Sequence, residues 1–115
     1  MSGAIRITFD RLPEIAAKLP QVTSMVVRKA AFDVEAQAKS ELYEGHGVDT
    51  GLLKSSIQTD MEGDLRAIVA PHTEYASYVE FGHHSFTGYH YMTQAAERVR
   101  PAFLEAMRRL EAMLR

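Results

Sequence analysis

The 115-residue chain contains no cysteine, which excludes a disulfide, a thiolate nucleophile and a cysteine-rich zinc site. No apolar run approaches the length of a membrane span, and residues 1–10 lack the apolar region of a signal peptide. The net charge is −2, with basic and acidic residues intermixed, so there is no electrostatic reason to expect a nucleic-acid partner. We therefore expect synthesis in the cytosol and no partnership with a membrane or a specific nucleic-acid sequence.

Apolar residues make up 46% of the chain, which argues against general disorder. The length suits one domain, residues 1–115, with a thin core. Alternation of Ile5, Ile7 and Phe9 with polar residues predicts a half-buried strand. Residues 10–19 contain Pro13 and are followed by Pro20, and they are expected to form a short helical turn or a linker.

A long helix is predicted over residues 20–44, with Pro20 at its first position and residues 45–47 as its stop. Glu35 and Lys39 are spaced for a favourable pair on its surface. Its predicted buried stripe recurs at intervals of four and three and consists of Val27, Ala31, Val34, Ala38 and Leu42.

The middle of the chain predicts a helical turn followed by a hairpin. Asp49 or Thr50 is a candidate cap for a short helix that carries Leu52 and Leu53 inward. Residues 57–61 and 65–70 then read as antiparallel strands, joined by a turn at residues 62–64 in which Gly63 takes a positive φ.

An aromatic, amphipathic stretch covers residues 74–82, and its spacing predicts a two-turn helix. Thr73 is its candidate N-cap, and Gly82 is placed for a left-handed stop. Residues 83–90 read as a polar, aromatic loop long enough to carry contacts.

The last helix is predicted from an N-cap at Thr93 to Arg115, and Pro101 inside it predicts a kink or break near residues 99–100. Its apolar stripe is predicted to consist of Val99, Phe103, Met107, Leu110 and Leu114. The predicted fold class is α+β, with a small antiparallel sheet packed against the long N-terminal helix and the C-terminal helix.

Few residues suggest chemistry. Glu80, His83, His84 and His90 could form a metal site, but a glycine separates the glutamate from the histidines and no His-Glu-x-x-His motif is present. Ser55 and Ser56 lack the Gly-x-Ser-x-Gly context of a nucleophile. The lack of an evident active site favours a structural or assembly role.

Two motifs resemble those of a known family. Residues 48–57, VDTGLLKSSI, are similar to its Val-Asp-Thr-Gly-x-Leu-(Arg/Lys)-x-Ser-Ile segment, and residues 74–82, EYASYVEFG, resemble its Tyr-Ala-x-Tyr-Val-Glu-Phe-Gly segment. Residues 100–104, RPAFL, are similar to its Arg-Pro-Phe-Leu segment with Ala102 inserted. The family is the tail-component, or neck, proteins of long-tailed bacteriophages, the gene-product-ten-like proteins of HK97-type phages and prophages.

The resemblance spans about residues 22–110. It implies a structural virion protein without catalysis or cofactor, which acts in tail assembly or head–tail connection as a homo-oligomeric ring. Its partners would be copies of itself and neighbouring neck or tail proteins, in the host cytoplasm during assembly and then in the virion. The matching positions, expected to have structural roles, are Asp49, Thr50, Gly51, Leu52, Ser56, Tyr75, Ala76, Tyr78, Val79, Glu80, Phe81, Gly82, Pro101 and Phe103.

Ring assembly requires exposed complementary surfaces. The candidate interface residues are His83, His84, Phe86, Tyr89 and Tyr91, together with the N-terminal strand, whose edge could pair across subunits. Two alternatives stay open: a small metal-binding, hydrolase-like enzyme that uses the Glu80–His90 cluster, and a module that binds host factors.

Overall fold

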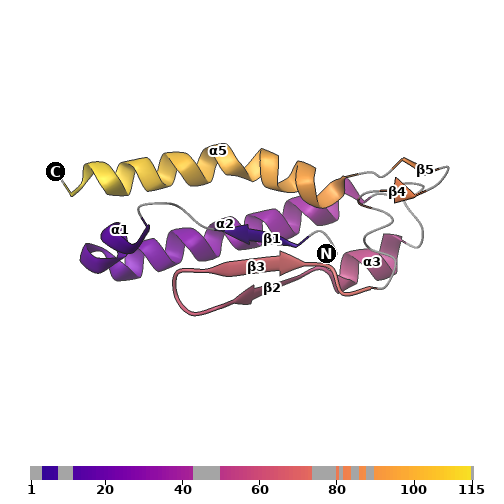
Figure 1. Cartoon of the computed structure of the whole chain (residues 1–115), viewed down its shortest axis with the longest axis horizontal. Coiled ribbons are helices and arrows are strands. Elements are labelled where there is room, and N and C mark those ends of the chain that lie inside the picture. The colour runs from indigo at the N-terminus through magenta and orange to yellow at the C-terminus, as the bar shows by residue number, and fades with distance from the viewer. Residues whose placement is uncertain are drawn as a thin grey trace.

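The computed structural model describes residues 4–7, 12–42, 50–73, 80, 82–83, 86–87 and 90–114. The molecule is elongated, with extents of 52 × 22 × 22 Å (Figure 1). In chain order its elements are β1 (Ile5–Ile7), α1 (Leu12–Lys18), α2 (Pro20–Glu41), α3 (Thr50–Ser56), β2 (Gln58–Met61), β3 (Ala67–Ala70), β4 (Gly82–His83), β5 (Phe86–Thr87) and α5 (Tyr91–Ala112).

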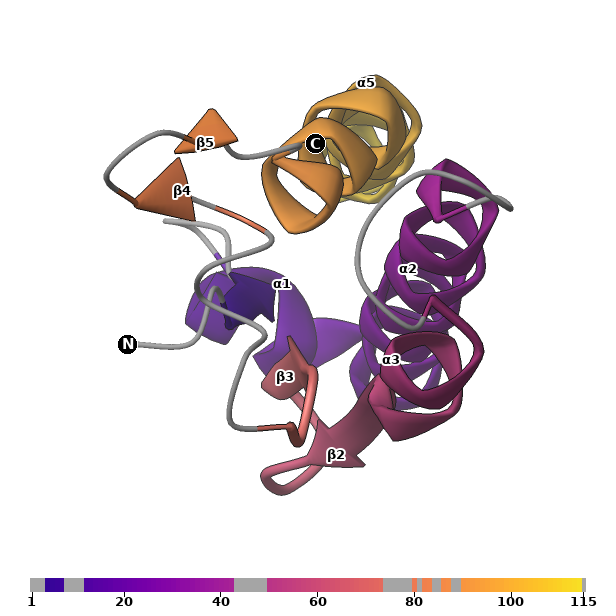
Figure 2. The same cartoon turned by 90° about the vertical axis from the view of Figure 1, so that its right-hand side faces the viewer.

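The main sheet has three strands in the order β1-β3-β2, and both neighbouring pairs are antiparallel. Helices α2 and α5 lie side by side, and α2 contacts all three strands while α5 contacts β1. Viewed from the end, both helices lie on one side of the β2–β3 hairpin (Figure 2). The predicted α+β class, with a small antiparallel sheet against the two long helices, is confirmed.

Helix α2 follows its predicted pattern. Pro20 stands in its first turn, and the whole predicted stripe from Val27 to Leu42 is buried. Lys39 Nζ donates to Glu35 Oε2 at 3.2 Å, as the spacing predicted. The helix ends at Glu41, three residues earlier than predicted, and the expected stop at residues 45–47 lies outside the described residues.

Helix α3 corrects one prediction. Leu53 is fully buried, whereas Leu52 is 53% exposed, although both were expected to point inward. Successive residues of a helix are separated by about 100° around its axis, so two adjacent side chains cannot share the centre of one buried face. Whether Asp49 caps this helix lies outside the described residues.

The hairpin is confirmed, with its second strand shorter than predicted. Gly63 has φ +82°, a conformation that glycine adopts without steric penalty. Glu62 N donates to Arg66 O at 2.8 Å and closes the turn, so β3 begins at Ala67 rather than at residue 65. In β3, Ala67 and Val69 are buried against the helices.

Helix α5 starts earlier than predicted and passes through Pro101 without a break. Its N-cap is His90 in a left-handed conformation, and Thr93 lies inside the first turn, so the prediction that Thr93 is the N-cap was wrong. Three members of the predicted stripe, Phe103, Met107 and Leu110, are buried. Arg98 Nε lies 2.8 Å from Glu41 Oε1 and joins α5 to the end of α2.

The segment before α5 also differs from expectation. Gly82 lies in strand β4 rather than in a left-handed helix stop, and β4 pairs with β5 where a loop was predicted. Residues 74–79, which the aromatic helix was expected to include, lie outside the described part of the chain. Among the described residues, no helix combines the length and the apolar character that a membrane crossing requires.

Candidate assembly interface

Glu80 connects the second family motif to the start of α5. It is fully buried, and its carboxylate accepts hydrogen bonds from Met92 N at 2.7 Å, Thr93 N at 3.1 Å and Thr93 Oγ1 at 2.5 Å. Its backbone carbonyl accepts one from His90 N at 3.0 Å. A carboxylate at a helix N-terminus satisfies amides that have no partner within the helix and interacts favourably with the helix dipole. Glu80 therefore acts as the cap that the sequence pattern had assigned to Thr93.

Ser56, in the first motif, links two segments in a similar way. Its Oγ donates to Leu53 O at 2.7 Å and accepts from His72 N at 3.2 Å. The end of α3 is thereby attached to the chain just after β3. The side chains of Glu80 and Ser56 thus each connect two segments of the chain.

The other motif positions are distributed widely. Thr50 and Gly51 open α3, Leu52 is exposed, and Gly82 begins β4. Pro101 is exposed on α5 and Phe103 lies in the core. The positions that lie outside the described residues are Asp49, Tyr75, Ala76, Tyr78, Val79 and Phe81.

The candidate metal cluster is not assembled by the described residues. His90 Nδ1 lies 3.9 Å from Glu80 Oε2, but both oxygens of Glu80 accept hydrogen bonds from α5. Among the described residues, no three histidine, aspartate or glutamate side chains gather closely enough to bind a metal ion. The side chains of His83 and His84 lie outside that description.

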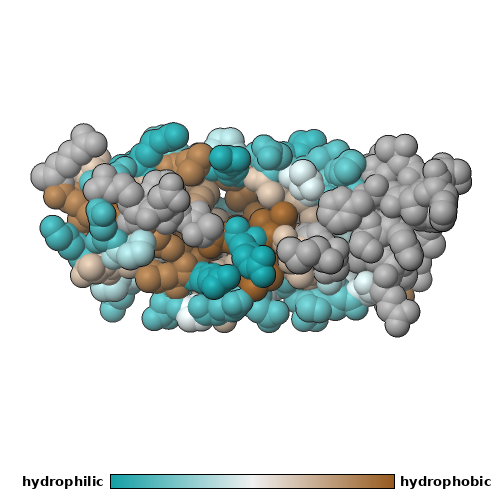
Figure 3. All heavy atoms as spheres, viewed as in Figure 1, coloured by the Kyte–Doolittle hydropathy of each residue, from teal (hydrophilic) through white to brown (hydrophobic). Residues whose placement is uncertain are grey.

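β1 and β2 are the outer strands of the main sheet, and among the residues that the structure describes no further strand pairs with either of them. A groove of about 270 Å³ runs between β1 and α5, over the α2 residues Ala30 and Val34. On the α5 side it is lined by Ala96, Glu97, Val99, Arg100, Phe103 and Leu104. An apolar hollow is visible near the middle of the molecule's face, with hydrophilic side chains around it (Figure 3).

Opposite charges occupy the two outer strands. Arg6 and Asp60 are both paired with Ile68, so the three residues form one row across the sheet. Arg6 and Asp60 are exposed, while their strand neighbours Ile7 and Met61 are more buried. The sequence predicted the N-terminal strand as an edge strand, but it did not indicate which residues of the other strands lie beside it. This row of residues was therefore not predicted. The sequence feature that could have indicated the row is a charged residue near the middle of each outer strand.

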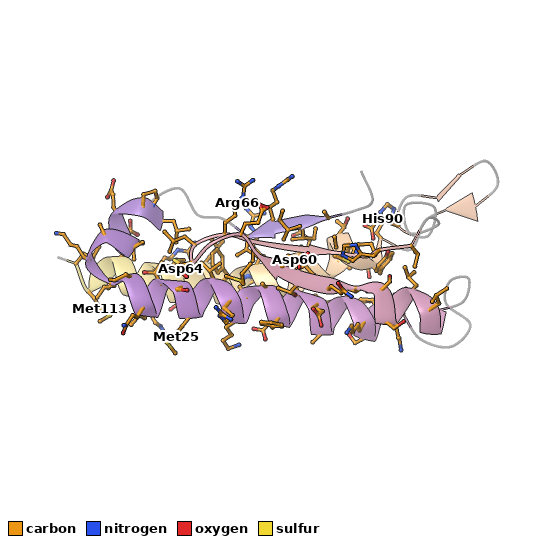
Figure 4. All side chains as sticks on the ribbon, turned by 90° about the horizontal axis from the view of Figure 1, so that it is seen from below. Met25, Asp60, Asp64, Arg66, His90 and Met113 are labelled. Carbon is orange, nitrogen blue, oxygen red and sulfur yellow. The ribbon has the colours of Figure 1, made fainter. Side chains whose placement is uncertain are left out.

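The solvent-facing side of α2 carries further apolar side chains. Met25 is 68% exposed and Phe32 is 49% exposed, and seven residues place both on the same side of the helix. Met25 and Met113, the latter at the end of α5, are seen at the same end of the molecule in Figure 4. These positions were not singled out from the sequence because the buried stripe of α2 dominates its pattern.

The predicted interface residues differ in where they lie in the fold. Tyr91 is fully buried in the first turn of α5, so it belongs to the core rather than to an exposed surface. His83 and Phe86 are partners in the β4–β5 pairing. His84 and Tyr89 lie outside the described residues. Both short strands lie at the end of the molecule opposite the C-terminus (Figure 1).

Comparison with known proteins gives one match. Residues 9–82 match the family model HK97-gp10_like, described as "Bacteriophage HK97-gp10, putative tail-component". The matched range includes the first two motifs and ends before the segment at residues 100–104. No curated protein and no solved structure matches the chain. Because the match covers more than half of the 115 residues, the chain belongs to the HK97-gp10-like family of bacteriophage tail components.

Proposed function

We propose that this protein is a structural, non-catalytic component of the phage neck or tail, which acts in tail assembly or head–tail connection as a homo-oligomeric ring. The family match over residues 9–82 carries the proposal, because it identifies a phage tail component. The whole chain, residues 1–115, acts in this proposal as one domain. It assembles in the host cytoplasm and is then retained in the virion.

The arrangement of the described residues supports an assembly role. The hydrogen bonds of the Glu80 and Ser56 side chains connect elements of the chain to one another. Within the described residues the main sheet ends in two outer strands without a further strand partner, and such edges are suited to pairing with another chain. These features fit a subunit whose function is to hold neighbours in place.

Deletion of the gene from its phage or prophage genome tests this function. We expect particles in which heads and tails fail to join or tails fail to complete, visible by electron microscopy. Mass spectrometry of purified wild-type virions should find the protein. Normal, infectious particles from the deletion, or virions that lack the protein, would refute the proposal.

The β4–β5 end is proposed to contact neighbouring phage proteins through His83, His84, Phe86 and Tyr89, with Tyr91 left out because it is buried. Aromatic side chains are enriched at protein interfaces, and this end projects along the long axis of the molecule (Figure 1). The double variant Phe86→Ala/Tyr89→Ala should fold normally by circular dichroism but fail to restore joined particles to the deletion strain. Full complementation would show that these residues are not the contact.

A further inference from the structure

The groove beside β1 has the position that a fourth strand would occupy. Neighbouring strands are about 4.8 Å apart, whereas packed helices are about 8–10 Å apart. A helix with its side chains is about 10–12 Å across, so two packed helices cover about 18–22 Å, whereas three strands cover about 14 Å. The helix layer is therefore wider than the sheet by at least about one strand. In this protein α2 contacts all three strands, and α5 contacts the outer strand β1. The groove lies between β1 and α5.

The walls of the groove suit an extended chain segment. One wall is the outer edge of β1, beside which the described part of the chain places no further strand, and an outer strand edge can pair with another chain. The opposite wall includes Val99, Phe103 and Leu104 of α5, of which Val99 and Leu104 are only half-buried. A strand added beside β1 would cover these apolar side chains and complete the layer under α5.

We infer that the added strand is β2 of a second copy of the chain, so that subunits join head to tail through their two sheet edges. The inference rests on the proposed function and names the surface through which the ring would form. In this joint Asp60 of one copy lies beside Arg6 of the next, which continues the row Arg6–Ile68–Asp60 across the boundary. Opposite charges placed side by side on neighbouring strands are favourable.

The side chains facing the helices also match in this register. Within one copy Ile5 shares a row with Val69 and Thr59, and Ile7 shares one with Ala67 and Met61. The joint would place Thr59 beside Ile5, and Met61 beside Ile7. Thr59 and Met61 are half-buried and Ile7 is buried, so the added contacts continue the covered face of the sheet.

Two-fold pairing of identical edges is disfavoured by the same residues. Arg6 is the middle residue of the three-residue β1, so a β1–β1 pair brings two arginines together. A β2–β2 pair centred near Asp60 brings two aspartates together. Like charges directly opposite each other are destabilising, whereas opposite charges are favourable. A β1 edge should therefore pair better with a β2 edge than either edge pairs with its own kind.

The joint also determines how the assembly grows. Because β1 and β2 are both antiparallel to β3, they run in the same direction, and head-to-tail subunits meet as a parallel pair. Such a contact is not self-complementary and repeats from copy to copy, closing into a ring when the rotation between neighbours allows it.

Introduced thiols test the joint, because the natural chain has no cysteine to interfere. Neighbouring strands place Cα atoms about 4.8 Å apart, within the range that a disulfide spans. Within one copy, positions 6 and 60 are separated by β3 and lie about 10 Å apart, which is beyond that range. A disulfide between these positions therefore reports a contact between copies.

Under mild oxidation, a mixture of the R6C and D60C variants should give a covalent dimer, and either variant alone should remain mostly monomeric. The double variant R6C/D60C should give a ladder of multimers on a non-reducing gel. Dimers from R6C alone or D60C alone, at the level of the mixture, would show two-fold pairing and overturn the inference. Absence of any covalent product above the monomer would also overturn it.

Charge reversal gives an independent test. R6D and D60R should each weaken self-association by about tenfold or more, and the double variant R6D/D60R should restore it, because the pair is then reversed. R66D and D64R are matched controls: both residues are exposed near the hairpin turn and lie outside β1 and β2 (Figure 4). Equal effects of the controls, or no rescue in the double variant, would contradict pairing of Arg6 with Asp60.

Failure of this joint is distinguishable from failure of the proposed function. If the thiols do not pair but deletion of the gene leaves heads and tails unjoined, the edge pairing is wrong and the assembly role stands. If the thiols pair but the protein is absent from virions, the chain self-associates for another purpose.

Discussion

Glu80 explains why a carboxylate follows the aromatic residues in the second family motif. A buried charge is unfavourable unless hydrogen bonds replace the lost water, and Glu80 has two amides and one hydroxyl of α5 as donors. His90, just before the helix, has φ 54°, an uncommon conformation for a residue other than glycine. The carbonyl of Glu80 accepts the amide hydrogen of His90 and helps to hold that conformation.

Replacing Glu80 by glutamine should lower the free energy of unfolding by about 2 kcal/mol, because hydrogen bonds to a charged acceptor are lost. The amide group also turns a donor toward the donors of α5. Chemical denaturation monitored by circular dichroism measures this change. Glu62→Gln, at an exposed position in the hairpin turn, is the control and should change stability by less than about 0.5 kcal/mol. Equal values for both variants would contradict the capping role.

The two adjacent leucines of α3 give a matched pair. Leu53→Ala should lower the free energy of unfolding by about 2–5 kcal/mol, because it leaves a cavity in the core. Leu52→Ala should change it by no more than about 0.5 kcal/mol, because that side chain is 53% exposed. Thermal or denaturant unfolding of both variants is the measurement. A large loss from Leu52→Ala would mean that the side chain is covered in solution.

At the scale of elements, α5 contains a proline, Pro101, that should make the helix less stable than a residue with a backbone N–H would. Pro101 cannot donate a backbone hydrogen bond to the preceding turn, and it lies on the exposed side of the helix. Substitution by alanine should therefore raise the free energy of unfolding, by about 1 kcal/mol or more. Ala106→Pro, one and a half turns further along, should lower it by about 3 kcal/mol.

Melting temperatures of these two variants and the natural protein provide the measurement. If Pro101→Ala lowers the melting temperature, the proline stabilises the helix through contacts that its ring makes, and the account of α5 would be wrong.

Periodicity predicted the long elements well and their ends poorly. The stripes of α2 and α5 appear in the sequence because a helix with one buried face must repeat apolar residues every three to four positions. The start of α5 does not appear, because its cap is supplied by Glu80, more than ten residues earlier in the chain. A local search finds Thr93 instead, since threonine is a common N-cap residue.

The register of the sheet was equally inaccessible. Alternation indicates which residues of β1 face inward, but the partner of Arg6 depends on where distant strands align. Consequently the Arg6–Ile68–Asp60 row, on which the inferred joint depends, required the folded structure. The predicted interface was instead based on aromatic composition, and that criterion included the buried Tyr91.

At the scale of the whole molecule, an elongated subunit with opposite charges on its two sheet edges is suited to repeated head-to-tail contact. Family membership indicates a phage tail component, and the ring is our proposal for how such a subunit acts. The groove under α5 gives that ring a specific surface on each subunit.

The most direct test is the mass of the natural protein in solution, measured by light scattering over a concentration series. We expect a discrete oligomer whose mass is a fixed multiple of 12.9 kDa and exceeds that of a dimer. High salt should weaken it, because the joint includes an exposed ion pair. A protein that remains monomeric at every concentration, or stops at a dimer, would contradict the proposed head-to-tail ring.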